Sequence, residues 1–281
     1  MKLIVESGAT KTDWRLVMDD AQVRTATSPG LNPSVLGVEQ ISKIIGSVIP
    51  VINPEGRSVS EIYFYGAGLV SAEASAPLAA ALEMWCPFAR MEFHSDMLAA
   101  ARALFGNGTG IVAIMGTGSN SCLYEDGAIV RNIRPGGFIL GDEGSGAALG
   151  KALLSDFVKG LLPQHIEEEL IKDFALDYQT IVRKVYREPA ASAYLASFAP
   201  FIIERTDDPY ISAMVRDCIE AFVKRSLARY ISDDKKIKVG VVGSFGCACE
   251  HFLREAGSEY GLEFTDFLKS PVDNLVTYHV I

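Results

Sequence analysis

The spacing of apolar and polar residues predicts that the chain begins with three short antiparallel strands. They lie at residues 3–6, 14–18 and 22–27, with a turn at Asp19-Asp20 between the second and third. Residues 38–52 then carry apolar side chains every three to four positions, which is the spacing of an amphipathic helix. A three-strand meander followed by a helix is therefore the first unit of the predicted fold.

Strands and helices alternate after this point. We expect a strand at 61–66, a helix at 74–85, a strand at 90–94 and a helix at 97–105. Residues 106–110 are all small or polar turn formers, which rarely continue a helix. They predict a boundary between an N-terminal lobe of residues 1–106 and a C-terminal lobe of residues 107–281.

The second lobe is predicted to repeat the plan of the first. Its meander is expected at 111–115, 121–124 and 128–131, and the layouts of 1–27 and 111–131 are similar without clear sequence similarity. A long helical insertion, a further strand and short C-terminal elements follow. They are expected at 146–231 (helices), 238–242 (strand), 251–256 (helix) and 262–264 (strand), with a last helix after Pro271 that could pack back on the first lobe.

The length of 281 residues allows two lobes of ordinary domain size. Hydrophobic residues make up 49% of the chain and the net charge is −9, which disfavours nonspecific binding to nucleic acids or anionic membranes. We expect neither partner. The positive surroundings that a bound phosphate needs would have to be local.

Other features of the sequence favour a cytoplasmic protein. No signal-peptide pattern is evident at the N-terminus, and no run of 18 apolar residues predicts a membrane span. Five scattered cysteines are typical of reduced thiols. The four histidines have no metal-ligand spacing, and no Ser-His-Asp order stands out, so a zinc site and a hydrolase triad are not expected.

The turn after the first strand carries the first candidate chemistry. Residues 6–13 read Glu-Ser-Gly-Ala-Thr-Lys-Thr-Asp. Gly8 would let the backbone approach an anion, and turn amides can form a nest for it. Thr10, Lys11 and Thr12 add donors, and Glu6 could hold a hydrated cation. An ordinary β-turn would also explain these residues, because short Gly/Thr motifs match often by chance.

Three further glycine-rich segments favour phosphate binding over an ordinary β-turn. Gly116-Thr117-Gly118-Ser119 follows the predicted strand 111–115, and Gly243-Ser244-Phe245-Gly246 follows the strand 238–242. Residues 141–146, Gly-Asp-Glu-Gly-Ser-Gly, open a predicted helix. Strand and glycine-loop units in both halves of the chain indicate a nucleotide held between two lobes.

The order of these motifs resembles the superfamily of sugar kinases, Hsp70 and actin ATPases. Within it, the chain resembles the N-acetylglucosamine kinase and BadF/BadG/BcrA/BcrD ATPase family. Residues 6–12 resemble its phosphate-1 hairpin, 116–120 its phosphate-2 hairpin and 243–244 its adenosine loop. The most group-specific stretch is Gly136-Gly137 followed by 141–145.

The resemblance implies a fold, an activity and a set of ligands. The fold would be α/β, with two ribonuclease-H-like lobes of the actin-like ATPase type and an interlobe cleft. The activity would be ATP-dependent phosphorylation of an N-acetylated amino sugar, most simply N-acetylglucosamine to its 6-phosphate. ATP and Mg²⁺ would be the cofactors, and the protein could be a homodimer.

The resemblance also assigns residues to these ligands. The nucleotide would be bound by the glycine-rich loops, at Gly8, Thr10, Lys11, Thr12, Gly116, Thr117, Gly118, Gly243 and Ser244. The sugar would contact Asn32, Asp96, Ser119, Asn120, Gly136, Gly137 and Asp142. Glu6 would bind Mg²⁺ through water, at a position where many superfamily members have aspartate.

Asp96 is the candidate catalytic base. It stands between a predicted strand and a predicted helix, so by position alone it could equally be a helix N-cap. His94-Ser95-Asp96 resembles the family segment that holds the catalytic aspartate, and this favours the base. A carboxylate with an ordinary pKa suffices for the role. Asp142 could likewise be an N-cap and Asn32 a turn residue, but the resemblance favours sugar contacts for both.

Two other functions stay open. The same family includes ATPases that activate a partner reductase and hold an iron–sulfur cluster with cysteines, although neither Cys86 nor Cys122 sits in a suitable cysteine motif. A sugar and ATP sensor without turnover is the other alternative. The presence of both Asp96 and the phosphate loops argues against a sensor.

Overall fold

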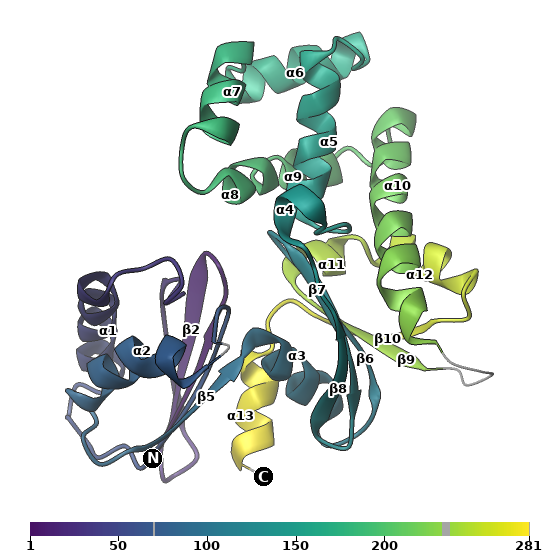
Figure 1. The fold of residues 1–281 in the computed structure, drawn as a ribbon. Helices are drawn as coiled ribbons and strands as arrows, with labels where there is room; N and C mark the ends of the chain where they lie inside the picture. Colours follow the sequence, from purple (N-terminus) through teal and green to yellow (C-terminus); the bar gives the residue numbers. More distant parts are fainter. Residues whose placement is uncertain (70, 232–236, 281) are drawn as a thin grey trace. The chain divides into compact units, whose positions relative to one another are not determined.

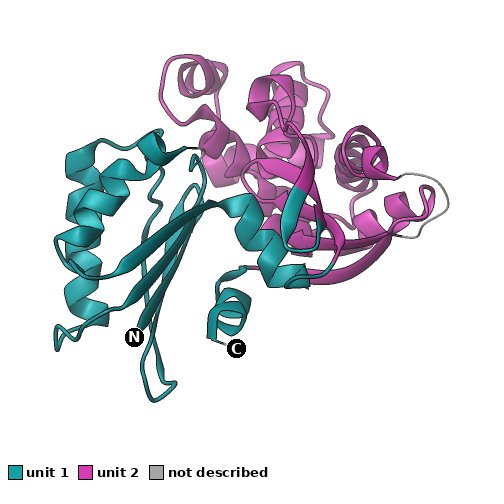
Figure 2. Ribbon diagram, turned by 60° about the horizontal axis from the view of Figure 1, so that its bottom comes forward, with its two compact units in different colours: residues 1–108, 125–129, 270–281 teal, residues 109–124, 130–269 magenta. Residues whose placement is uncertain are grey.

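The computed structural model describes residues 1–69, 71–231 and 237–280, which divide into two compact units (Figures 1 and 2). Unit 1 comprises Met1–Gly108, Glu125–Ile129 and Ser270–Ile281, and unit 2 comprises Thr109–Tyr124 and Val130–Lys269. The C-terminal segment thus belongs to unit 1. A division into folding domains at 106/107 remains our proposal.

Unit 1 contains a mixed five-stranded sheet of order β3-β2-β1-β4-β5. The strands are β1 (Lys2–Ser7), β2 (Lys11–Val17), β3 (Val23–Pro29), β4 (Glu61–Gly66) and β5 (Arg90–Ser95). The meander β1 to β3 is antiparallel, whereas β4 and β5 run parallel to β1. Parallel strands end at one edge of a sheet, so the segments after β1, β4 and β5 meet at that edge.

Helices cover both faces of the unit 1 sheet. On one face α1 (Val38–Ile52) packs against α2 (Ala72–Glu83); on the other α3 (Asp96–Phe105) packs against α13 (Val272–Val280). The helix α1 forms because Ile41, Ile45, Val48 and Ile49 recur at helical spacing and are all buried. They join Trp14, which is fully buried, in the core of this unit.

Unit 2 contains a second five-stranded sheet, of order β8-β7-β6-β9-β10. Its strands are β6 (Gly110–Met115), β7 (Ser119–Glu125), β8 (Ala128–Ile133), β9 (Lys238–Val242) and β10 (Glu263–Leu268). As in unit 1, the first two strands are antiparallel and the last two run parallel to the first. The two sheets therefore share one plan, which confirms the predicted repetition.

Most of the helices of unit 2 lie between β8 and β9 in sequence (Figure 1). They are α4 (Gly137–Leu140), α5 (Gly146–Val158), α6 (Gln164–Phe174), α7 (Tyr178–Tyr186), α8 (Ala191–Ala196), α9 (Ala199–Ile203), α10 (Pro209–Arg225) and the 3₁₀ turn η1 (Leu227–Tyr230). Two more, α11 (Ser244–Ala248) and α12 (Glu250–Ser258), follow β9. One core joins α5, α10 and the sheet, with Leu153, Ile219 and Val241 fully buried.

The structure differs from the sequence expectation in several elements. Residues 137–140 form the one-turn helix α4, in a stretch for which the apolar pattern predicts no helix, and none of its residues is buried. The expected strand 262–264 extends to Leu268, and the expected helix 251–256 to Ser258. These are short elements, for which apolar spacing covers too few residues to mark an end.

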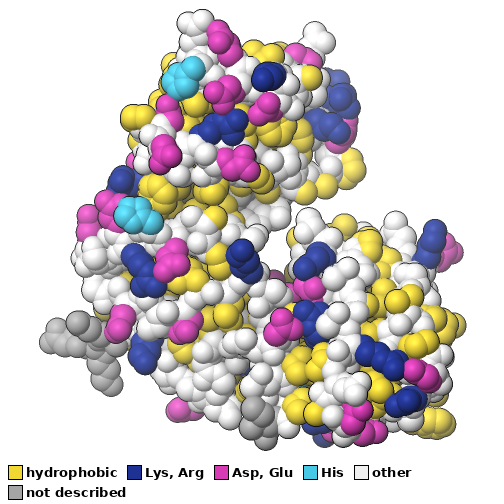
Figure 3. All heavy atoms as spheres, turned by 180° about the vertical axis from the view of Figure 1, so that it is seen from behind, with side chains coloured by type: hydrophobic (Ala, Val, Ile, Leu, Met, Phe, Trp, Pro, Cys, Tyr) yellow, Lys and Arg dark blue, Asp and Glu magenta, His cyan; other side chains and the backbone are white. Residues whose placement is uncertain are grey.

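Three further observations concern membrane-spanning helices, cysteines and surface charge. Within the three described ranges, no helix is long and apolar enough to cross a membrane. All five cysteines are free thiols. On the face shown in Figure 3, cationic and anionic side chains are intermingled. The expected absence of nucleic-acid and membrane partners stays a prediction.

Candidate active site

The turn between β1 and β2 is held by backbone contacts. The Gly8 N–H donates to the Lys11 carbonyl at 2.9 Å, and the Gly30 N–H donates to the Thr10 carbonyl at 3.1 Å. A Cβ atom on Gly30 would lie 2.6 Å from the Gly8 oxygen and 2.7 Å from the Ala9 oxygen, so only glycine fits there. Gly30 thereby fixes the turn and leaves Ala9 and Thr10 exposed.

Thr12 lies inside this hairpin. It is fully buried, and its hydroxyl lies 2.8 Å from the Ser7 hydroxyl and 3.0 Å from the Pro29 carbonyl, to which it donates. The Ser7 hydroxyl also accepts from the Leu31 N–H at 2.8 Å. Thr12, which the sequence motif assigns to the nucleotide, is thus occupied by framework contacts. We propose that it supports the turn and that Thr10 and Lys11 face the phosphates.

Three carboxylates gather near the edge of the unit 1 sheet. Glu6 pairs with Asp13 in the β1–β2 register. The pKa of Glu6 is raised to about 7, chiefly by burial and then by the charges of Asp13 and Asp96; Lys11 opposes the shift. The Lys11 Nζ lies 2.8 Å from the Asp13 carboxylate. Arg15 lies 4.0 Å from the same carboxylate, whereas no ion pair to Glu6 or Asp96 forms among the described residues. A cation brought by a ligand would supply positive charge to these two carboxylates.

Asp96 is the first residue of α3, directly after β5. The N-cap is Ser95, whose Oγ accepts from the Leu98 N–H at 3.2 Å. The alternative that Asp96 caps the helix is therefore wrong, although its Oδ1 accepts from the Met97 N–H at 2.9 Å. Burial raises the pKa of Asp96 above its ordinary value.

Asn32 forms part of the loop between β3 and α1. Its Oδ1 accepts from the Ser34 N–H at 2.9 Å, as in the expected turn. Gly68 has a positive φ of 80°, and a Cβ there would lie 2.5 Å from this oxygen. The Nδ2 donor makes no hydrogen bond to any described residue, so Asn32 can hold its turn and still donate to a ligand.

Magnesium is the metal that the oxygen ligands of unit 1 would suit. No group of three or more His, Cys, Asp or Glu side chains is arranged to hold a metal ion directly, among the residues described. Glu6 would therefore act through water on an ion carried by phosphates. Mg²⁺ keeps several waters in such sites, so the residues present fit this role.

In unit 2, two glycine loops that are far apart in sequence line one cavity of about 310 Å³. Gly116 and Thr117 follow β6, and Ser244 and Phe245 follow β9. The remaining lining is small and apolar, from Gly146, Ala196, Ala199, Pro200, Ile203 and Ala248. A largely apolar cavity with a few polar groups suits a heterocycle joined to a polar tail.

Close backbone contacts hold these two loops together. Gly243 has a φ of 121°, and a Cβ on it would lie 2.1 Å from the Met115 carbonyl oxygen. At the start of α5, the Gly146 N–H donates to the Gly116 carbonyl at 2.9 Å and the Ala147 N–H to the Thr117 carbonyl at 3.0 Å. Main-chain contacts thus fix the position of each loop.

Asp142 lies in the loop before α5 in a strained conformation. Its φ is 57°, in the left-handed region that residues other than glycine seldom adopt, and it is 8% exposed. Its Oδ2 would lie 2.9 Å from a Cβ on Gly118, and its carboxylate accepts from the Ser119 N–H. Burial raises its pKa. Ser145 caps α5 through the Ala148 N–H, so Asp142 is not the N-cap.

The other predicted sugar residues of unit 2 differ in their hydrogen bonds and backbone conformation. The Ser119 hydroxyl donates to the Glu143 carbonyl at 2.6 Å. Asn120 Oδ1 accepts from the Ser121 N–H and from Asn132, which leaves its amide donors for a ligand. Gly136 and Gly137 have positive φ values of 79° and 71° and lead into α4.

Sequence reasoning misses residues that shape the candidate groups of each unit. Asp13 stands inside the hairpin motif but outside the expected strand, and no pattern in the sequence signals its burial at 5% exposure. Gly30 acts through steric contacts with Gly8 and Ala9, 22 and 21 residues earlier in the chain, which no local pattern signals. Ala196, Ala199 and Ala248 line the cavity, yet small apolar residues look like ordinary core in a sequence.

This geometry defines an α/β protein with two sheets of one plan and a small cavity at glycine-rich strand ends. Residues 5–231 match the model of the BadF/BadG/BcrA/BcrD ATPase family, and the chain belongs to this family. The fold class predicted from the sequence is confirmed. The interlobe cleft and the site residues remain proposals.

Solved structures show the same fold. A protein from Porphyromonas gingivalis, described as a proposed N-acetylglucosamine kinase, is 36% identical with a TM-score of 0.93, over 99% of this chain and 98% of that one. Another so described, from Chromobacterium violaceum, is 20% identical with a TM-score of 0.76, over 99% and 98%. A ROK family glucokinase from Streptomyces griseus, in complex with glucose and AMPPNP, is 15% identical with a TM-score of 0.61, over 99% and 97%. No curated protein matches this chain.

Removing the charge of Glu6 should stabilise the fold at alkaline pH. The ordinary pKa is 4.5 and the folded value about 7, so the folded chain holds the proton more tightly. The resulting penalty is absent below pH 4.5 and complete above pH 7. Glu6→Gln should therefore raise the free energy of unfolding by up to about 3 kcal/mol at about pH 8, at roughly 1.36 kcal/mol per pKa unit, and change it little at about pH 4.5.

Urea unfolding at the two pH values measures this difference. Glu83→Gln, at an exposed position at the end of α2, is the matched control and should change stability little at either pH. Equal effects of Glu6→Gln at both pH values would contradict the assigned pKa.

If the 310 Å³ cavity holds the nucleotide, as we propose below, filling it should block nucleotide binding. Ala248 lines the cavity at the end of α11 and lies outside the buried core, so Ala248→Trp can enter the cavity without disturbing that core. We expect the Kd for ATP to rise by at least about tenfold, or about 1.4 kcal/mol. Ser258→Trp, at the exposed end of α12 and outside the lining, should leave the Kd unchanged in calorimetry. Unchanged affinity in Ala248→Trp would place the nucleotide elsewhere.

Proposed function

We propose that this protein is an ATP-dependent sugar kinase whose acceptor is an N-acetylated amino sugar, with N-acetylglucosamine giving its 6-phosphate as the leading reaction. The 310 Å³ cavity carries the proposal, because Gly116, Thr117 and Ser244 belong to the two loops that resemble nucleotide-binding motifs and all three line it. The family supports ATP use. The 36% identical relative described as a proposed N-acetylglucosamine kinase supports the acceptor.

Asp96 is the proposed base. A sugar hydroxyl donates its proton to the Asp96 carboxylate as its oxygen bonds to the γ-phosphorus of ATP, and the bond from that phosphorus to the β-phosphate oxygen breaks to release ADP. The raised pKa of Asp96 makes it a stronger proton acceptor once it is ionised. Lys11 and the amides of the hairpin turn would stabilise the charge on the transferred group. Mg²⁺ would neutralise phosphate charge when bound.

Asp142 and Asn32 are the proposed sugar-orienting groups. A carboxylate that accepts two hydroxyl hydrogen bonds can fix the face of a sugar ring. The buried Asp142 carboxylate accepts from the Ser119 N–H, and its further lone pairs retain acceptor capacity. The Asn32 amide donor would complement it at an acceptor oxygen of the sugar.

The Asp96→Asn variant tests the base. We expect kcat to fall by at least about 10²-fold, because an amide cannot accept the proton. ATP affinity should persist, since the cavity that we assign to the nucleotide does not include this residue. A coupled assay of ADP release with N-acetylglucosamine measures kcat. Calorimetry measures the ATP affinity separately. Wild-type turnover in Asp96→Asn would remove Asp96 from this role.

The Asp142→Ala variant tests sugar recognition. Loss of a charged hydrogen-bond acceptor should raise the sugar KM by about tenfold or more, since such bonds contribute about 1.5–3 kcal/mol. The ATP Kd should change little. Asp217→Asn, which neutralises an exposed carboxylate on α10, serves as the comparison and should change the sugar KM little. A defect of Asp142→Ala confined to ATP binding would count against the sugar role.

The reductase-activating alternative is poorly supported by the cysteines. Ligation of an iron–sulfur cluster requires accessible thiolates. Cys86 is 4% exposed and Cys122 is fully buried, with its pKa raised to about 12 by burial. Neither thiol fits such a role. A sensor without turnover is distinguished by the same ADP-release assay.

A further inference from the structure

One face of α10 contacts the loop that carries Asp142. Cys218, Phe222 and Arg225 stand four and three residues apart, which places them on one side of a helix. Each contacts a residue that follows Asp142. We term these three residues the α10 clamp, and the acidic loop is Asp142 to Ser145.

The contacts of the clamp run in order along the acidic loop. Arg225 pairs with the Glu143 carboxylate at 2.7 Å. Gly144 has a φ of 70°, and a Cβ there would lie 2.5 Å from the Phe222 Cβ, so glycine is required at this contact. The backbone amides of Gly144 and Ser145 donate to the Cys218 sulfur. Three successive residues are thus held by one helix.

This arrangement explains how the strained Asp142 backbone persists. A non-glycine residue in the left-handed region costs on the order of 1–3 kcal/mol and is kept only where its surroundings determine it. On the N-terminal side, the Asp142 N–H donates to the Pro135 carbonyl at 3.0 Å and fixes the backbone there. On the C-terminal side, the α10 clamp holds the residues that follow Asp142. The side chain is then directed at Gly118 and Ser119.

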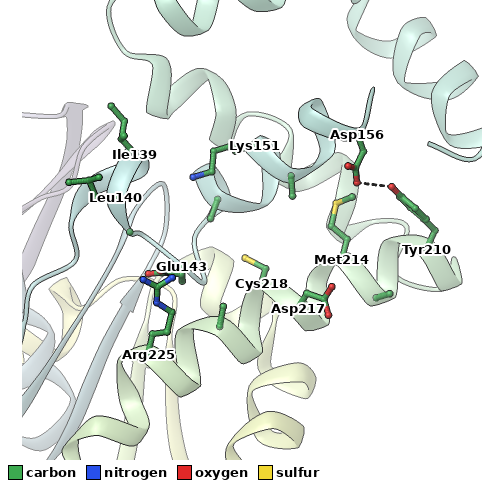
Figure 4. Close-up of a pocket in the computed structure, with 15 residues that line it drawn as sticks. Ile139, Leu140, Glu143, Lys151, Asp156, Tyr210, Met214, Asp217, Cys218 and Arg225 are labelled. Carbon is green, nitrogen blue, oxygen red and sulfur yellow. Dashed lines mark hydrogen bonds and ion pairs between the residues drawn. The ribbon is translucent and has the colours of Figure 1, made fainter. Parts of the chain in front are cut away.

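A second cavity, of about 540 Å³, adjoins the clamp (Figure 4). Its lining includes Glu143, Cys218 and Arg225, together with Lys151 and Asp217. Figure 4 shows Arg225 beside Glu143 and Cys218 farther along the same helix. The Arg225 side chain is 65% exposed, so its charge can be removed without opening the core.

We propose that Cys218, Phe222 and Arg225 are positioning residues that set the place of the Asp142 carboxylate for sugar binding. The proposal rests on the proposed kinase function and deepens it. None of the three lines the cavity that we assign to the nucleotide. Loss of the clamp should therefore weaken sugar binding and leave nucleotide binding and the proton transfer step unchanged.

Two variants test the clamp. Arg225→Met keeps the aliphatic stem and removes the pair with Glu143. Cys218→Val keeps an apolar side chain, larger by one methyl group, and removes the acceptor for the two amides. We expect each to raise the sugar KM by about fivefold, with kcat and the ATP Kd near wild type, the pattern of lost ground-state binding. Arg225→Lys should restore most of the affinity. The melting temperature should change little in Arg225→Met, because exposed pairs stabilise weakly.

Two residues of α10 supply matched controls. Asp217 is exposed, lines the same cavity and forms no ion pair with a described residue, so Asp217→Asn should be neutral. Arg216 pairs with Glu255 instead of the acidic loop, so Arg216→Met removes an arginine pair from the same helix without touching the clamp. Wild-type sugar KM in both clamp variants, or an equal rise in the controls, would overturn the proposal.

Hydrogen exchange separates failure of the clamp from failure of the kinase proposal. If the wild-type protein phosphorylates no amino sugar, the proposed function is wrong. The clamp is still tested by exchange at the amides of Gly144 and Ser145, which should become faster in Cys218→Val and stay unchanged in Asp217→Asn. Unchanged exchange in Cys218→Val would contradict the clamp whatever the enzymatic result.

Discussion

The ends of β6 and β9 lie so close that only a glycine fits between them. Gly243 faces the Met115 carbonyl, and the first amides of α5 donate to the Gly116 and Thr117 carbonyls. These contacts are between main-chain atoms, so they are stiff and independent of side-chain rotamers. Because of them, Thr117 and Ser244 line one cavity, and the proposed nucleotide site is built into the main chain of the fold.

The second feature of the protein is its unfavourable burial of acidic groups. Glu6, Asp96 and Asp142 all have pKa values raised chiefly by desolvation. Burying a charge without a full set of partners costs stability, so such groups persist where a ligand or a reaction uses them. A cation at Glu6, a proton at Asp96 and sugar hydroxyls at Asp142 would each supply what the folded chain lacks.

Much of the fold could be predicted because its strands and long helices follow regular spacing. The helix α1 begins and ends where the apolar pattern indicates, and both meanders lie at the expected positions. The glycine loops could be found because a turn at a strand end needs particular residue types. What could not be predicted depends on contacts across the chain, such as Gly30 against Ala9 or the α10 clamp against the acidic loop. The choice of Ser95 and Ser145 as caps, which frees Asp96 and Asp142, also depends on the folded geometry.

The central claim is that the proposed nucleotide loops, Asp96 and Asp142 serve phosphoryl transfer to an amino sugar. The most direct test is to incubate the purified protein with ATP, Mg²⁺ and a panel of sugars, to follow ADP release, and to locate the phosphate in the product by ³¹P NMR. The account predicts that N-acetylglucosamine is converted to its 6-phosphate, with one ADP released per sugar consumed. ADP release that is independent of every sugar, or none at all, would contradict it.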